Sequence, residues 1–343
     1  MSLKTLYFTG PGKVEVRESD IPSPEANTVL VKTIATGISS GTELLIYRGQ
    51  APSDMIADAT ISSLSHALTF PFPYGYCAVG EVVETGLGVH AGWVGKRVFA
   101  FHHHASYFLA APETLIEVPA DLGTEEAIFL PNMETAVNLL LDGKPLIGER
   151  AAVFGQGIVG LLTLSLLAMQ PIFQLISFDL HPERRKASLA AGAHCSLDPL
   201  APDCREQVNA LIPKNGEYAR FDLAYELSGS PAALDQAVSL TGYDGRVIVG
   251  SWYGTKRASL DLGSHFHRSR MKLISSQVST ISPDLLGRWN KVRRLDAAWE
   301  MIRRIRPAKY ITHRYPIERA AEAYETLDKQ EDAIIQAVLT YEN

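Results

Sequence analysis

The stretch VFGQGIVG, residues Val153–Gly160, decides the fold class predicted for this chain. Its glycines Gly155, Gly157 and Gly160 have G-x-G-x-x-G spacing, after the strand-like run AAVF and at the start of a long apolar, helix-like run. In a strand–turn–helix unit, glycines at this spacing permit a tight turn, close approach of a diphosphate and close packing of helix on strand. The stretch therefore predicts a dinucleotide site in which the helix N-terminus holds the diphosphate; a sheet turn without a ligand is the alternative.

An acidic residue further along supports the dinucleotide interpretation. Asp179 ends the next strand-like run, LISFD, 24 positions after Gly155 (179 − 155). A carboxylate there accepts hydrogen bonds from the ribose hydroxyls and repels a 2′-phosphate, which favours NAD over NADP. Arg184 and Arg185 follow closely, and they either serve such a phosphate or lie on a helix surface.

The chain as a whole divides into two regions of different pattern. Before Pro119, short β-branched runs closed by glycine or proline, such as TVLVKTIATG and CAVGEVVETG, predict a compact barrel. After Pro119, strands and helices alternate, which is typical of a doubly wound parallel sheet and makes the chain an α/β protein. We expect a barrel domain of residues 1–131 and 280–343 and a dinucleotide-binding domain of residues 132–279.

Two short segments are expected at the cofactor-binding edge of the parallel sheet. LSGS (Leu227–Ser230) and SWYG (Ser251–Gly254) follow its fourth and fifth strands, and ligands bind at the carboxyl ends of such strands. Small residues there would let a nicotinamide ring lie against the backbone, and Trp252 either stacks on a substrate or closes the cleft. The predicted cofactor-binding residues are Gly155, Gln156, Gly157, Ile158, Val159, Gly160, Asp179, Leu180, Arg184, Ser228, Gly229, Ser251 and Trp252.

Composition excludes several classes of partner. The 343 residues are 46% hydrophobic and carry a formal net charge of −6, which gives no electrostatic footprint for nucleic acid or an anionic membrane. The three cysteines are an odd number, so a disulfide framework is not expected. The longest apolar run, Gly157–Met169, is shorter than the roughly 20 residues that span a bilayer, and the N-terminus lacks the apolar core of a signal peptide. We therefore expect a cytoplasmic protein with a small-molecule substrate.

Four stretches resemble the medium-chain dehydrogenase/reductase superfamily of zinc-type alcohol dehydrogenase-like proteins: ATGISSGTE (Ala35–Glu43), PYGYCAVGEVVETG (Pro73–Gly86), VFGQGIVG and FDLHPERRKASLAAGAH (Phe178–His194). The resemblance covers essentially the whole chain. It implies a GroES-like β-barrel catalytic domain, a Rossmann domain and NAD(P)-dependent oxidoreductase activity. It also implies a homodimer formed through the strand near Lys272–Val278.

Three other stretches look most like a zinc-lacking subgroup of that superfamily: SSGTELLIYRG (Ser39–Gly49), FAFHHHASYFLAAP (Phe99–Pro112) and FHRSRMKLISSQVS (Phe266–Ser279). The subgroup is similar to the hydroxyethyl bacteriochlorophyllide dehydrogenases, which oxidise a hydroxyethyl side chain on a chlorin. The resemblance does not name a substrate for this chain. The basic residues of FHRSRMK either meet a substrate carboxylate or phosphate, or form a solvated loop or a subunit contact.

The resemblance also locates the positions at which zinc-dependent members hold their catalytic metal. Their I-C-G-S-D stretch reads ISSGTE here, so the thiolate position falls on Ser39 or Ser40. Their G-H-E reads Gly-Tyr-Cys, which replaces the imidazole by the phenol of Tyr76, and at the third position only Glu134 could ligate. Catalytic zinc needs about three ligands drawn from thiolate, imidazole and carboxylate, so no zinc is expected. Cys77, next to Tyr76 on a strand, should face the opposite side.

The run His102–His104 is the remaining candidate for a metal site. On an extended segment His102 and His104 share a face, and with Glu43 they could hold a divalent ion if the three met in space. Hydrogen-bonded histidines, or histidines that contact a substrate, are the simpler interpretation. The resemblance to the subgroup implies that both line the substrate pocket.

Without zinc, a hydrogen-bond donor must polarise the reacting oxygen. We expect Tyr76 to donate to that oxygen, Thr42 and a histidine to relay the proton, and Glu43 to orient them; a core-lining phenol is the alternative for Tyr76. The predicted catalytic residues are Tyr76, Thr42, Ser39, Ser40, Glu43, His102 and His104.

Three functions fit these observations. The first is a zinc-independent, NAD-dependent dehydrogenase of a secondary alcohol or ketone. The second is an NADPH-dependent reductase of quinones or enoyl compounds, and the third is a nucleotide-binding redox sensor without turnover. The long segment Arg48–Thr69 is expected to form a lid or a subunit contact.

Overall fold

The computed structural model describes residues 2–52, 67–212, 220–329 and 334–341. Most of the segment expected to form a lid, residues 53–66, lies outside the described residues. The chain divides into two compact units, one of Met1–Pro131 and Arg306–Asn343 and one of Asn132–Ile305. Among the helices that the structure describes, none is both long enough and apolar enough to cross a bilayer.

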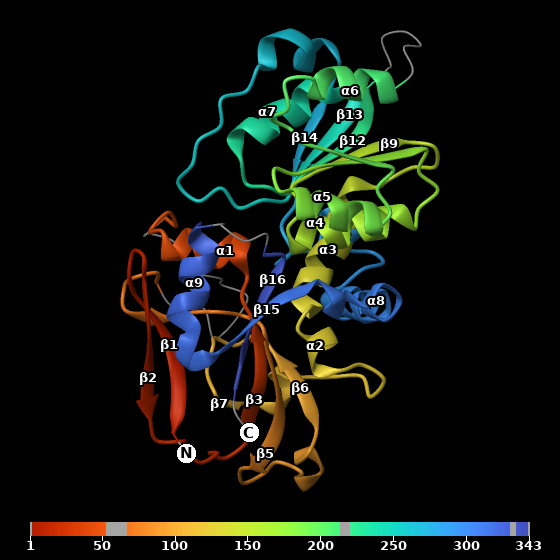
Figure 1. Cartoon of the computed structure of the whole chain (residues 1–343). Coiled ribbons are helices and arrows are strands. Elements are labelled where there is room, and N and C mark those ends of the chain that lie inside the picture. Colours follow the sequence, from red (N-terminus) through yellow and green to blue (C-terminus); the bar gives the residue numbers. More distant parts are fainter. Residues whose placement is uncertain (1, 53–66, 213–219, 330–333, 342–343) are drawn as a thin grey trace. The chain divides into compact units, whose positions relative to one another are not determined.

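The second unit is built on a six-stranded sheet with the order β11-β10-β9-β12-β13-β14 (Figure 1). All of its strand pairs are parallel. The strand order reverses at the β9–β12 pair, and in doubly wound sheets ligands bind outside the carboxyl ends of the strands at such a point. The strands are β9 (Arg150–Phe154), β10 (Gln174–Phe178), β11 (Cys195–Leu197), β12 (Phe221–Glu226), β13 (Thr241–Val249) and β14 (Lys272–Ser275).

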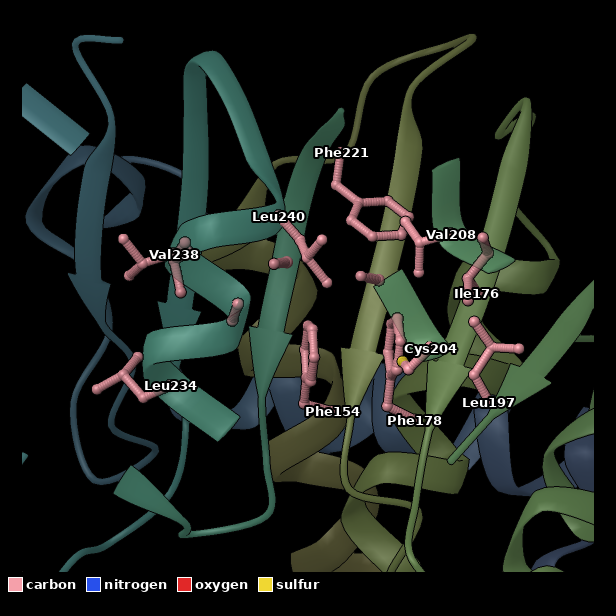
Figure 2. Close-up of a cluster of buried hydrophobic side chains, with 14 of the residues drawn as sticks. Phe154, Ile176, Phe178, Leu197, Cys204, Val208, Phe221, Leu234, Val238 and Leu240 are labelled. Carbon is pink, nitrogen blue, oxygen red and sulfur yellow. The ribbon is translucent and has the colours of Figure 1, made fainter. Parts of the chain in front are cut away.

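Helices cover both faces of this sheet, as parallel sheets require. On one face, the stacked rings of Phe154 and Phe178, 4.3 Å apart, pack against α6 and α7 (Figure 2). On the other face, Leu164 and Leu167 of α4 and Leu139 of α3 form a second buried cluster. The helices of this unit are α3 (Leu130–Gly143), which begins at the unit boundary, α4 (Ile158–Ala168), α5 (Pro182–Ala190), α6 (Cys204–Leu211), α7 (Pro231–Leu240) and α8 (Lys291–Ile305).

The second domain boundary differs from the sequence prediction. The division after Pro131 agrees with it, but residues 280–305, assigned to the barrel domain, belong to the dinucleotide-binding unit. Helix α8 packs against α4, and its Arg294, only 1% exposed, pairs with Glu134 of α3 at 2.9 Å. Arg294 also donates to Asn138 Oδ1 at 2.6 Å. An amphipathic pattern shows that a helix has a buried face, but it does not show which core covers that face.

The first unit contains a seven-stranded sheet and a three-stranded sheet, both of them largely antiparallel. The larger sheet runs β15-β16-β3-β5-β6-β8 with β7 also on β3, and the smaller runs β2-β1-β4. Strand β3 pairs with β5, β7 and β16, which curls the sheet around the Val31, Val82 and Phe108 core. The strands are β1 (Leu3–Gly10), β2 (Lys13–Ser19), β3 (Val29–Gly37), β4 (Phe72–Pro73), β5 (Ala78–Thr85), β6 (Arg97–Ala100), β7 (Tyr107–Ala110), β8 (Ile116–Glu117), β15 (Ile311–Pro316) and β16 (Gln336–Thr340).

Short helices complete the first unit: α1 (Ser40–Tyr47), α2 (Thr124–Ala127) and α9 (Ala320–Lys329). Helices α1 and α9 lie side by side (Figure 1), and the rings of Tyr47 and Tyr324 stack at 5.7 Å between them. This pairing brings residues from opposite ends of the chain to the predicted catalytic positions. The two units together are the GroES-like barrel and Rossmann layout expected from the sequence.

Candidate functional site

The three glycines of the dinucleotide turn have three different surroundings. Gly155 has a φ of +89°, and a Cβ on it would lie 2.7 Å from Ser228 Cα. A Cβ on Gly160 would lie 1.9 Å from the Gly155 carbonyl oxygen, whereas a Cβ on Gly157 would meet nothing within 4 Å. The turn therefore needs Gly155 and Gly160 for its own packing, and Gly157 leaves space open for a ligand.

Helix α4 begins at this open position. Gly157 is its N-cap, no side chain caps the helix, and no acidic residue lies in its first turn. Ile158 and Val159 are its first two residues, so their N–H groups belong to the helix end that carries unsatisfied donors and positive dipole. This arrangement can bind a diphosphate without a cationic side chain.

Asp179 lies directly after β10 and is 7% exposed. Its Oδ2 accepts a hydrogen bond from the Gln156 amide at 2.7 Å, and its Oδ1 accepts one from the His181 amide at 2.8 Å. A carboxylate can accept about four hydrogen bonds, so it retains capacity for ribose hydroxyls. Gln156 is fully buried within the turn, and its side chain donates to the Val153 carbonyl at 2.9 Å.

The two arginines near Asp179 differ in their roles. Arg185 donates to the carbonyls of Asp179 and Leu180 at 2.9 and 2.8 Å, which commits it to the local backbone. Arg184 interacts with the Asp179 charge; burial lowers the pKa of its guanidinium, and that charge opposes the shift. Leu180 is 51% exposed at the edge of the site. Of the two, Arg184 stays the candidate for contact with a cofactor phosphate.

The segments after β12 and β13 are held together by a buried carboxylate that the sequence analysis missed. Glu226, the last residue of β12, is fully buried, and its Oε1 accepts hydrogen bonds from the Ser228 amide at 2.8 Å and the Gly229 amide at 3.1 Å. Ser251 Oγ accepts a second hydrogen bond from the Gly229 amide at 2.9 Å. Trp252 is half-buried beside them. The predicted residues Ser228, Gly229 and Ser251 thus lie together at the carboxyl edge of the sheet.

In the first unit, four of the predicted catalytic residues meet at the start of α1: Ser39, Thr42, Glu43 and Tyr76. The Tyr76 hydroxyl donates to Ser39 Oγ and is also hydrogen-bonded to Thr42. Burial raises the pKa of Tyr76 to about 12, against the effect of those two hydrogen bonds, so the phenol is protonated at neutral pH. Ser40 is the first residue of α1 and is half-buried.

A buried network centred on Glu43 supports this pair. Glu43 Oε1 accepts a hydrogen bond from the Ser39 amide at 2.8 Å. Its Oε2 is hydrogen-bonded to His104 Nε2 at 3.0 Å and to the Tyr324 hydroxyl. Glu43, His104 and Tyr324 are all 0% exposed. On its other side, His104 Nδ1 lies 2.7 Å from Thr36 Oγ1. Glu43 therefore has the orienting position expected of it, since it fixes the residue that bonds to Tyr76.

The expectation that His102 and His104 share a face is wrong. The segment turns instead of extending, with the His102 amide bonded to the Ala100 carbonyl at 3.0 Å. His102 stacks on Phe108 at 4.2 Å, whereas both nitrogens of His104 bond within the Glu43 network. Complete burial and those bonds make His104 a positioning residue, not a wall of a substrate pocket. A substrate contact of His102 stays a prediction.

The residues at the family's zinc positions do not suit that metal. Ser39 and Tyr76 are neutral hydroxyls bonded to each other, and Glu134 is paired with Arg294. The thiol of Cys77 donates to the Ile128 carbonyl at 2.8 Å. Burial raises the pKa of Cys77 to about 12, which disfavours the thiolate that zinc requires. Within the described ranges, no three His, Cys, Asp or Glu side chains cluster as metal ligands do.

Sequence reasoning missed Thr36, Tyr324 and Glu226. For Glu226 a signal existed, because an acidic residue that ends an apolar strand and precedes LSGS is unusual for a buried position. Thr36 and Tyr324 lie in an ordinary strand and an ordinary amphipathic helix, so nothing local distinguishes them.

Comparison with known proteins agrees with the geometry. A family model described as zinc-binding dehydrogenase matches residues 159–293. The (R,R)-butanediol dehydrogenase of Bacillus subtilis strain 168 is 28% identical over 281 residues, which cover 73% of this chain and 78% of that protein.

Solved structures share the fold at low sequence identity. A structure described as a short chain alcohol dehydrogenase from Escherichia coli CFT073, in complex with NADH, has a TM-score of 0.78 at 18% identity and covers 99% of both chains. A putative zinc-binding dehydrogenase from Sinorhizobium meliloti 1021, bound to NADP, has a TM-score of 0.76 at 18% identity, also with 99% of both chains covered. In sequence the chain is similar to zinc-type alcohol dehydrogenase-like proteins of the medium-chain dehydrogenase/reductase superfamily, and it is an NAD(P)-dependent oxidoreductase.

Proposed function

We propose that this dehydrogenase works without zinc and transfers hydride between NAD(H) and a secondary alcohol or its ketone. The observation that carries the proposal is the hydrogen bond from Tyr76 to Ser39, which pairs the phenol at the imidazole position with one of the two serines that fall on the thiolate position. The substrate class is inferred from the (R,R)-butanediol dehydrogenase relative, because butanediol in that name is a secondary alcohol.

Hydride donation and acceptance are the chemistry that a bound nicotinamide dinucleotide supplies. The protein must polarise the substrate oxygen and move one proton. Hydroxyl groups can exchange donor and acceptor roles, so Tyr76 can turn its proton to a substrate oxygen while Ser39 donates to the phenol. The raised pKa of Tyr76, about 12, keeps that proton in place at neutral pH. A positioned acid–base group of this kind contributes roughly 10²–10⁴-fold to the rate.

The Glu43 network keeps this donor pair in one orientation. Glu43 Oε1 holds the backbone of Ser39 in place through its amide, and the Ser39 hydroxyl is bonded to Tyr76. His104 and Tyr324 occupy the other carboxylate oxygen, which prevents Glu43 from turning toward the phenol. Preorganised donors stabilise charge that develops on a reacting oxygen without reorganisation during the reaction.

The preference for NAD follows from Asp179. Its buried carboxylate lies next to the dinucleotide turn, where it would accept ribose hydroxyls and repel a 2′-phosphate. Arg184, which interacts with Asp179, is the observation that favours the alternative of an NADPH-dependent reductase. Titration of the protein with NADH and NADPH, followed by nicotinamide fluorescence, separates the two.

Metal analysis with activity assays tests the proposal directly. The protein is purified, treated with a chelator and analysed for zinc, and alcohol oxidation is then measured with NAD on a panel of secondary alcohols. We expect full activity at far less than one zinc per chain. Activity that disappears with the metal and returns with added zinc would refute the zinc-free mechanism.

A further inference from the structure

A carboxylate with an unusual number of partners lies at the end of β12. Glu226 Oε1 accepts hydrogen bonds from the Ser228 amide at 2.8 Å, the Ser228 hydroxyl at 2.5 Å and the Gly229 amide at 3.1 Å. Its Oε2 accepts the Tyr253 hydroxyl at 2.6 Å. The side chain is 0% exposed, so these donors replace water completely. Burying a carboxylate is costly unless several donors satisfy it in this way.

The donors come from two different segments. Ser228 and Gly229 follow β12, whereas Tyr253 follows β13, the neighbouring strand in the sheet. Ser251 adds a second link, because its hydroxyl donates to the Glu226 carbonyl at 3.3 Å and accepts from the Gly229 amide at 2.9 Å. Glu226 thus links the segment after β12 to the segment after β13 at the carboxyl edge of the sheet.

The segment after β12 also contacts the dinucleotide turn. Because a Cβ on Gly155 would lie 2.7 Å from both Ser228 Cα and Ser228 N, no side chain fits between the turn and the segment after β12. Gly229 has a φ of +67°, in the left-handed region that glycine adopts readily. If the carboxylate were removed, the Ser228 amide would lose its acceptor, whereas the Gly229 amide would keep Ser251 Oγ.

We infer that Glu226 is a positioning residue for the cofactor: it fixes the Ser228–Gly229 and Ser251–Tyr253 segments against which the nicotinamide half lies. The inference rests on the predicted contact of these segments with the nicotinamide. It does not rest on the absence of zinc or on the identity of the alcohol. The adenosine half is held elsewhere, by the α4 N-terminus and Asp179.

NADH and ADP-ribose together test the two halves of the cofactor site, because ADP-ribose lacks the nicotinamide. We expect Glu226→Ala to raise the dissociation constant of NADH, measured by fluorescence, about tenfold, because the Ser228 amide and the hydroxyls of Ser228 and Tyr253 lose their acceptor and the Gly229 amide loses one of two. The dissociation constant of ADP-ribose, which lacks the nicotinamide, should change less than about threefold when measured by calorimetry. Glu226→Gln should restore most of the NADH affinity, since its carbonyl can still accept from Ser228 and Gly229 while its amide donates to Tyr253.

A control variant separates an effect on cofactor positioning from an effect on the stability of the fold. Glu149, 9% exposed, is a carboxylate of the same unit that pairs with Arg246 at 2.7 Å beside the start of β9, away from the carboxyl edge. Glu149→Gln should lower the melting temperature and leave NADH affinity unchanged. If Glu226→Ala does not fold, Tyr253→Phe, which removes one donor, should weaken NADH about threefold without an effect on ADP-ribose.

Unchanged NADH affinity in a folded Glu226→Ala variant, or in Tyr253→Phe if that variant does not fold, would overturn the inference. Equal losses for NADH and ADP-ribose would also overturn it, because they would indicate general damage to the fold. Both binding assays proceed without substrate or metal, so their outcome is independent of the zinc-free mechanism.

Discussion

The Tyr76 hydroxyl donates its hydrogen bond to the hydroxyl of Ser39, the N-cap residue of helix α1. The phenol therefore lies in a fixed place at the start of a helix whose own orientation depends on a buried carboxylate, Glu43. Burial keeps this phenol protonated, with a pKa of about 12. A protonated donor with a fixed direction is what a metal-free alcohol dehydrogenase needs.

Replacing Tyr76 by Phe should lower kcat at least about tenfold, because the reacting oxygen loses its hydrogen-bond donor. The affinity for NADH should not change, since the dinucleotide turn lies in the other unit of the chain. Tyr47→Phe is the matched control: Tyr47 is a buried aromatic residue of α1 whose ring stacking on Tyr324 the variant retains. Steady-state kinetics and NADH fluorescence measure both effects, and equal kcat in the two variants would exclude Tyr76 from the mechanism.

Two glycine substitutions in the dinucleotide turn should have different effects: one should weaken NADH binding, and the other should destabilise the fold. Gly157→Ala should fold with an unchanged melting temperature, because its Cβ meets nothing within 4 Å, but it should weaken NADH at least about tenfold by filling the diphosphate space. Gly160→Ala should destabilise the fold itself, since its Cβ would lie 1.9 Å from the Gly155 carbonyl oxygen. Calorimetric melting and NADH titration of both variants check this pair; NADH binding of normal strength by Gly157→Ala would contradict the diphosphate assignment.

Asp179→Asn should shift cofactor preference toward NADPH by about tenfold, because the charge that repels a 2′-phosphate is removed while one acceptor for the Gln156 amide remains. Asp198→Asn provides the control, since Asp198 pairs with Arg185 at 3.5 Å on the same side of the unit. The ratio of kcat/KM for NAD and NADP is the measurement. A preference that is the same in the wild type and Asp179→Asn would remove Asp179 from cofactor selection.

His102 should make stability depend on pH in a defined window. Burial lowers its pKa to about 4, whereas an unfolded histidine titrates near 6.5. As the pH falls through this window the unfolded chain binds the proton first, so the contribution of neutral His102 is complete above about 6.5 and is lost toward 4.

His102→Phe should keep the stacking on Phe108 and lose less stability between pH 7 and pH 5 than the wild type does. Urea unfolding at the two pH values measures this difference, in which contributions from the carboxylates cancel. Parallel losses in the two proteins would show that His102 titrates normally in the folded state.

The features that the sequence predicted are those that depend on local chemistry. The positions of Gly155, Gly157 and Gly160 follow from a turn of a few residues, and Asp179 follows from the end of the next strand. Strand and helix alternation after Pro119 was sufficient for the parallel sheet, because its buried strands and apolar helices have distinct patterns.

Features that depend on tertiary contacts were not predictable from the residues alone. Helix α1 was missed, and with it the geometry by which Glu43 receives Tyr324 from the other end of the chain. His102 and His104 diverge because the backbone turns at this point, which no alternation rule for strands anticipates. Helix α8 was assigned to the wrong unit because its amphipathic pattern does not show that its Arg294 pairs with Glu134 of α3.

The strand pairing of the first unit has a consequence for biosynthesis. Strand β16, which pairs with β3 through Val338 and Gly37, is synthesised only after the residues Asn132–Ile305 that separate it from β3 in the chain. The intervening residues Asn132–Ile305 form a separate compact unit, and domains generally fold as units during synthesis. The edge of β3 at Ala35–Gly37 therefore stays without its β16 partner until the nucleotide-binding unit has been synthesised.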